Sequence, residues 1–154
     1  MSAGPDKHDQ RRQNHRRRRA RRLALQALYQ WQMTGESVPE ILAQFRENEG
    51  FENADAAYFD ELVRGVTGGL DEIDAALAPY LQRDMESVDP VERAVLRLAG
   101  YELLHRMDLP YRVVINEAIE LAKKFGADQS HRFVNGVLDN AVKDLRKIEV
   151  QAAR

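Results

Sequence analysis

The chain has 154 residues, 44% of them hydrophobic, which is enough for one self-sufficient core and for one domain or little more. It contains no cysteine, which excludes disulfides and thiolate metal sites and fits a reducing cytoplasm. No apolar run approaches the roughly 20 residues that span a bilayer, and the charged N-terminus lacks the apolar segment of a secretory signal. We therefore expect a cytoplasmic protein that does not enter a membrane.

Charge is distributed unevenly along the chain. Residues 1–22 hold nine lysines and arginines and two aspartates, a net +7, so the rest must carry −9 to give the total of −2. A basic arm on an acidic body predicts that an anionic polymer binds at one end. Residues 1–15 contain almost no apolar groups that could offset the entropy of ordering, so we expect a disordered basic arm there and a folded domain over residues 16–150.

The first helical pattern starts near Arg16 and runs to Gly35. Apolar side chains recur on one face at Ala20, Ala24, Ala27, Leu28 and Trp31. A separate stripe carries Arg18, Arg22, Gln26 and Tyr29. Guanidinium groups grip phosphates and a tyrosine ring can stack on an unpaired base, so this stripe predicts an RNA-binding surface. Two other interpretations stay open, a solubilising tail for the arginines and half-buried packing for the tyrosine.

Start and stop signals divide the middle of the chain into three short helices. Ser37 can cap the first of them, Asn53 or Asp55 can start the second, and Gly68-Gly69 separates it from a third that Pro79 disturbs near its end. The paired glycines are not a phosphate loop, because no Gly-Lys-Ser/Thr follows them.

The last third of the chain predicts a central helix followed by a helix hairpin. Asp89-Pro90 starts a helix that is apolar around most of its circumference, as in a buried helix. A second helix follows Pro110 with a wide apolar stripe, and we expect it to end in a left-handed turn at Gly126. Asp128 or Ser130 can cap the next helix. The joint between the two displays Lys123, Lys124, Gln129, His131, Arg132 and Phe133. After Leu145 we expect a frayed tail.

No group of residues predicts catalysis, a metal site or a cofactor. The four histidines form no His-x3-His pair, and there is neither a dinucleotide fingerprint nor a P-loop. A single histidine such as His131 is weak evidence for a metal, because a site needs several converging ligands. The absence of period-two alternation argues against strands, so the expected fold is all-α with about seven helices.

The hairpin carries a resemblance to a known family. The segments PYRVVINEAIELAKKFG (110–126) and SHRFVNGVLD (130–139) closely resemble the C-terminal signature of the NusB family of bacterial transcription antitermination factors. The resemblance continues upstream in LQALYQWQ (25–32) and VERAVLR (91–97), and so covers nearly everything after about residue 16. It implies two small helical bundles set across each other.

The resemblance also implies a function and a set of positions. NusB-like proteins bind the boxA element of nascent RNA, commonly with the ribosomal small-subunit protein NusE, and help RNA polymerase read through terminators, notably in ribosomal RNA operons. The positions that match the RNA surface are Arg17, Arg18, Arg19, Arg21, Gln26, Tyr29, Gln129, Arg132 and Phe133. Glu92 and Tyr111 match the partner-facing side. Gln129 stands where relatives often have an acidic residue, a change that should favour RNA if this position contributes.

Three alternatives remain at this level. NusB-like domains also form the N-terminal part of certain ribosomal RNA cytosine methyltransferases, but no Gly-rich methyl-donor domain follows Arg154, so we expect a stand-alone factor. A protein-interaction or oligomerisation module with a solubilising arm is a different class of function. Some family members self-associate into homodimers, which could hide the RNA face.

Overall fold

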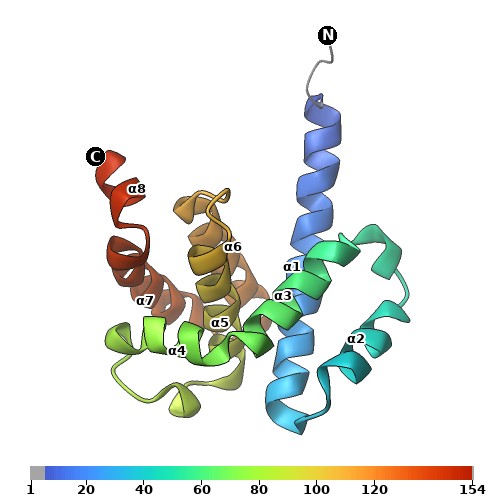
Figure 1. The fold of residues 1–154 in the computed structure, drawn as a ribbon, viewed down its shortest axis with the longest axis horizontal. Helices are drawn as coiled ribbons and strands as arrows, with labels where there is room; N and C mark the ends of the chain where they lie inside the picture. The colour runs from blue at the N-terminus through green and yellow to red at the C-terminus, as the bar shows by residue number, and fades with distance from the viewer. Residues whose placement is uncertain (1–5, 154) are drawn as a thin grey trace. The chain divides into compact units, whose positions relative to one another are not determined.

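The computed structural model describes residues 6–153. All of its regular elements are helical, and the eight α-helices are α1 (Lys7–Thr34), α2 (Val38–Arg46), α3 (Ala56–Gly68), α4 (Leu70–Leu77), α5 (Pro90–His105), α6 (Tyr111–Phe125), α7 (Ser130–Leu145) and α8 (Lys147–Ala152) (Figure 1). Three 3-10 turns, at Phe51–Asn53, Ala78–Tyr80 and Met85–Ser87, connect them. Residues 6–153 form no strand, so the predicted all-α fold is confirmed. No helix in this range is long and apolar enough to span a membrane.

The chain divides into two compact units, as expected for two small bundles, and the boundary falls inside α3 between Arg64 and Gly65. In the first unit, α1 contacts α2, and Ser37 caps α2 by accepting a hydrogen bond from the Glu40 N–H. Asp55 caps α3 in the same way at Tyr58. Phe59 is fully buried against the rings of Phe45 and Phe51, at centroid distances of 5.9 and 5.3 Å.

Helix α1 begins earlier than the expected start near Arg16. The structure shows residues 7–15 as helix rather than as a disordered arm, while residues 1–5 lie outside the described part of the chain. Asp6 caps the helix by accepting from the Asp9 N–H at 2.8 Å, and arginine and glutamine have good helix propensity. Every side chain from Lys7 to His15 is exposed, so this extension adds nothing to the core. Gly35 ends the helix in the left-handed conformation, at φ 69°.

Helix α5 is the centre of the second unit. It contacts α4, α6 and α7, and its residues from Ala94 to Gly100 are all buried, which confirms the prediction of a central helix. Helix α6 packs against both α5 and α7, and this explains why its apolar stripe is wide. Asp89 caps α5 by accepting hydrogen bonds from the N–H groups of Val91 and Glu92.

The joint between α6 and α7 differs in two details from the prediction. Gly126 does not adopt a left-handed turn; it is extended, with φ −93° and ψ 179°. Glycine is required there by a close approach, because an added Cβ would lie 2.7 Å from both the Ala122 carbonyl oxygen and the Ser130 Cβ. Neither Asp128 nor Ser130 caps α7: Gln129 occupies the cap position without a side-chain hydrogen bond, and Ser130 is the first helical residue.

The C-terminal tail forms α8 instead of fraying after Leu145. Arg146, only 4% exposed, is the reason, because its guanidinium donates to the carbonyl oxygens of Leu103 (2.8 Å), Leu109 (2.9 Å), Arg106 (2.9 Å) and Glu102 (3.3 Å). These carbonyls lie at the end of α5 and in the loop before α6. Glu149 completes the anchor by pairing with Arg146 at 2.6 Å.

Candidate nucleic-acid interface

The polar stripe of α1 is exposed along most of its length. Arg18, Arg19 and Gln26 are exposed, and the ring of Tyr29 is 40% exposed at the end of the stripe. Gln26 donates to the Arg22 carbonyl at 3.2 Å, one turn earlier. The stripe therefore presents positive charge, an amide and an aromatic ring on the surface of one helix.

Arg17 and Arg21 are placed differently from the other predicted arginines. Both guanidinium groups lie over the ring of Tyr58, at 5.2 and 5.5 Å from its centroid, and Arg21 is only 4% exposed. Burial leaves Arg21 no surface for a phosphate, so its expected role changes to packing against α3. Its spacing from Ala24 and Leu25 already places it on the apolar face of the helix.

Arg16, which was not among the predicted site residues, ties α1 to the segment before α3 within the first unit. Its guanidinium donates to the carbonyl oxygens of Ala54 at 3.0 Å and Glu52 at 3.3 Å. The N–H of Asp55 donates back to the Arg16 carbonyl at 3.1 Å. These contacts hold the segment before α3 against α1, and no sequence signal connects residues so far apart.

The second unit brings the other predicted RNA-binding residues together at the α6–α7 joint. Gln129 and Arg132 are exposed, and Phe133 is half-buried beside them. The guanidinium of Arg83, from the loop after α4, lies over the Phe133 ring at 5.1 Å from its centroid. Sequence reasoning missed Arg83, because this loop carries no pattern that ties it to α7.

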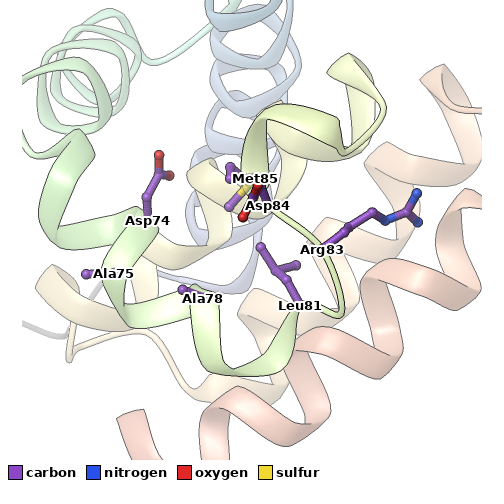
Figure 2. Close-up of a pocket in the computed structure, with 7 residues that line it drawn as sticks. All are labelled: Asp74, Ala75, Ala78, Leu81, Arg83, Asp84 and Met85. Carbon is purple, nitrogen blue, oxygen red and sulfur yellow. The ribbon is translucent and has the colours of Figure 1, made fainter.

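A pocket of about 490 Å³ lies beside the loop that carries Arg83 (Figure 2). Its lining residues are Asp74, Ala75, Ala78, Leu81, Arg83, Asp84 and Met85. The Asp74 carboxylate is already engaged by Arg97, with two hydrogen bonds of 3.0 and 2.8 Å. In Figure 2 the Arg83 side chain extends away from the other lining residues, so its guanidinium belongs to the joint and not to the pocket.

The two predicted partner-facing residues occupy separate places in the second unit. The Glu92 carboxylate accepts a hydrogen bond of 2.7 Å from the hydroxyl of Ser130, which is 2% exposed. Glu92 therefore lies beside the α6–α7 joint. Tyr111 follows the opposite end of α5, and at 1.5 Å per residue the helix alone separates the two positions by roughly 20 Å.

Tyr111 is held by the C-terminal anchor. Its N–H donates to Glu149 at 2.8 Å, and its hydroxyl accepts from Arg112 at 3.1 Å. Burial acts to raise the pKa of the Glu149 carboxyl, but the hydrogen bond from Tyr111 and the interaction with Arg146 outweigh it and lower the pKa below its ordinary value. This carboxylate thus stays charged and holds the start of α6 in place.

No metal-binding cluster occurs in the described range, residues 6–153, where no three histidine, aspartate or glutamate side chains are grouped to hold an ion. His8 and His15, which lie in the exposed start of α1, contact Arg12 and Arg19 one turn away.

Comparison with known proteins gives a consistent result at each level. Residues 18–143 match the model of the NusB family. The transcription antitermination protein NusB of Xanthomonas axonopodis pv. citri is 57% identical over 137 residues, which are 89% of this chain and 86% of that protein. The corresponding protein of Xanthomonas oryzae pv. oryzae is 58% identical over 133 residues, covering 86% and 85%.

Solved structures of this family superpose on most of the chain. NusB of T. maritima matches with a TM-score of 0.77 and 35% identity, over 87% of this chain and 96% of that one. A crystal structure of the antitermination factors NusB and NusE in complex with dsRNA matches with a TM-score of 0.75 and 31% identity, over 82% and 95%. Since the family model covers residues 18–143 and a curated NusB protein is 57% identical over 89% of the chain, this chain belongs to the NusB family.

Proposed function

We propose that this chain is a transcription antitermination factor that binds boxA-type single-stranded nascent RNA together with NusE. In this role it promotes read-through by RNA polymerase in ribosomal RNA operons, and it acts in the cytoplasm, where that RNA is made. The observation that carries the proposal is 57% identity to transcription antitermination proteins across 89% of the chain. A solved relative in complex with NusE and dsRNA supports NusE and RNA as the two kinds of partner. The role is one of binding and needs no catalytic group.

The surface chemistry fits an RNA strand with unpaired bases. Arg18 and Arg19 are exposed to contact phosphates, which position a strand without reading its sequence. Tyr29, and Phe133 with its neighbours Gln129 and Arg132, offer ring faces and hydrogen-bonding groups to bases. We assign Arg17 and Arg21 to support through Tyr58, and Glu92 and Tyr111 to binding NusE.

The test is affinity for a boxA-containing single strand and for a scrambled strand, with and without NusE, at two salt concentrations. We expect a preference for the boxA strand that NusE increases, and weaker binding of both strands at higher salt. Equal, weak binding of both strands with and without NusE would contradict the proposal and favour a protein-interaction module. Light scattering at the same concentrations detects a homodimer that hides the RNA face.

A further inference from the structure

Arg83 differs from the ion-paired arginines of the second unit by what surrounds it. Arg93, Arg97, Arg106 and Arg146 each form an ion pair with a carboxylate. Among residues 6–153, the structure gives the Arg83 guanidinium one partner, the ring of Phe133. The Asp74 carboxylate is engaged by Arg97, and the Glu86 carboxylate by Arg93 and Arg97. The structure gives no ion pair between Arg83 and its neighbour Asp84 among residues 6–153.

This arrangement leaves the Arg83 guanidinium accessible to a ligand. Its side chain is exposed, and its Cζ lies over the Phe133 ring, 5.1 Å from the ring centroid, which is within cation–π distance. The N–H donors at its edge meet no carboxylate within the described chain. A planar, weakly hydrated cation with one supported face is a surface on which a nucleobase can stack.

We propose that Arg83 is a further RNA-binding residue, forming the outer layer of a stacking platform whose inner layer is Phe133. The inference rests on the proposed function. An unpaired base stacks on the guanidinium, while the ring beneath limits its rotation and so reduces the entropy lost on binding. Phe133 then supports the platform from below, because Arg83 already covers its ring.

A stacking platform requires a planar group, whereas phosphate binding requires only positive charge. A substitution that keeps the charge and removes the plane therefore distinguishes the two roles. Arg83→Lys keeps the positive charge but removes the plane. We expect it to weaken binding of the boxA strand about 5-fold or more, as for the loss of one stacked base. The slope of log affinity against log salt should change by less than about 0.7, which is the change expected for the loss of one phosphate contact.

Arg112→Lys is the matched control, because Arg112 is also exposed and lies over an aromatic ring, that of Tyr111, at 5.6 Å. It should leave RNA affinity of the free protein unchanged. A direct signal comes from 2-aminopurine placed at successive positions of the boxA strand. One position should be quenched in the wild-type complex, and Arg83→Lys should relieve that quenching.

Two results would overturn the inference: wild-type affinity for Arg83→Lys, or quenching that survives the substitution. If either result is found while the wild type still prefers the boxA strand, the proposed function is unaffected. Loss of that preference in the wild type itself refutes the proposed function instead. Circular dichroism and melting of Arg83→Lys should match the wild type, since the side chain is exposed.

Discussion

Each unit of this protein contains an arginine paired with an aromatic ring, but the two pairs differ in burial. In the first unit Arg21 lies over Tyr58, and both side chains are buried, at 4% and 3% exposure. In the second unit Arg83 lies over the half-buried Phe133 and remains exposed. The same contact therefore serves packing where it is shielded from water and is available to a ligand where it is not.

The surfaces around these pairs are also built differently. The basic stripe of α1 comes from one continuous helix, so local sequence is enough to produce it. The α6–α7 joint is assembled from distant segments, including the loop that carries Arg83 and the start of α5 that carries Glu92. We expect substitutions at the α6–α7 joint to act through tertiary contacts, and substitutions of the exposed arginines on α1 to act on charge alone.

The largest expected effect is on the anchor of the second unit. Arg146→Leu removes a buried charge that four carbonyl oxygens and Glu149 share, and with it the hydrogen bonds that tie α8 to the end of α5 and the loop before α6. We expect a loss of about 3 kcal/mol or more in the free energy of unfolding, measured by urea denaturation. Lys143→Gln, at an exposed position of α7, is the control and should change it by less than about 0.5 kcal/mol. An unchanged midpoint for Arg146→Leu would show that α8 is not anchored by this residue.

Removing the ring of Tyr29 or of the half-buried Phe133 should weaken RNA binding and leave stability nearly unchanged. Tyr29→Ala removes a stacking surface, and Phe133→Ala removes the ring that supports Arg83; each should cost roughly 1–3 kcal/mol of binding. Tyr58→Ala is the contrasting control, because its buried ring should instead cost about 3–5 kcal/mol of stability. Denaturation and RNA titration of all three variants decide the assignment. A destabilised Phe133→Ala with normal affinity would assign that ring to packing.

Replacing the exposed arginines should reduce affinity without changing preference. Arg18→Gln combined with Arg19→Gln should weaken boxA and scrambled strands by similar factors, since phosphates carry no base information. If two phosphate contacts are lost, the log–log salt slope should become shallower by about 1.4 for a single strand. Arg21→Gln should lower the melting temperature instead. Selective loss of boxA binding in the double variant would mean that α1 reads bases.

We expect a smaller effect on binding affinity at Glu92. The substitution chosen there keeps the hydrogen bond with Ser130 and changes only the charge. Glu92→Gln keeps an acceptor for the Ser130 hydroxyl and removes only the charge. Binding of NusE, measured by titration calorimetry, should weaken several-fold, as for an exposed or half-exposed charge pair of up to about 1 kcal/mol. RNA binding by the free protein should stay nearly unchanged. Ser130→Ala tests the hydrogen bond alone, and an equal loss of NusE binding there would assign Glu92 to positioning the joint.

The smallest effect should follow removal of residues 1–15. Their side chains from Lys7 to His15 are exposed, and the contacts of Arg16 with Glu52 and Ala54 remain in a chain that starts at Arg16. We expect a free energy of unfolding within about 0.5 kcal/mol of the full chain and a cooperative transition. A marked fall in melting temperature would show that this part of the chain docks on the body.

The sequence by itself determined the features that depend on neighbouring residues. Helical periodicity predicted the all-α fold and the central α5, and the caps at Ser37 and Asp89 follow from side chains that bond the nearest free N–H groups. The prediction that residues 1–15 are disordered used composition, whereas the helix from Lys7 depends on a local cap and good helix formers.

Tertiary structure alone decided how those helices use their side chains. Arg21 is buried because Tyr58 packs against it from α3. Ser130 bonds Glu92 instead of capping its own helix, and Arg146 orders the tail by reaching carbonyls far earlier in the chain. These contacts join residues that are distant in sequence, and periodicity carries no information about which distant side chain will meet which.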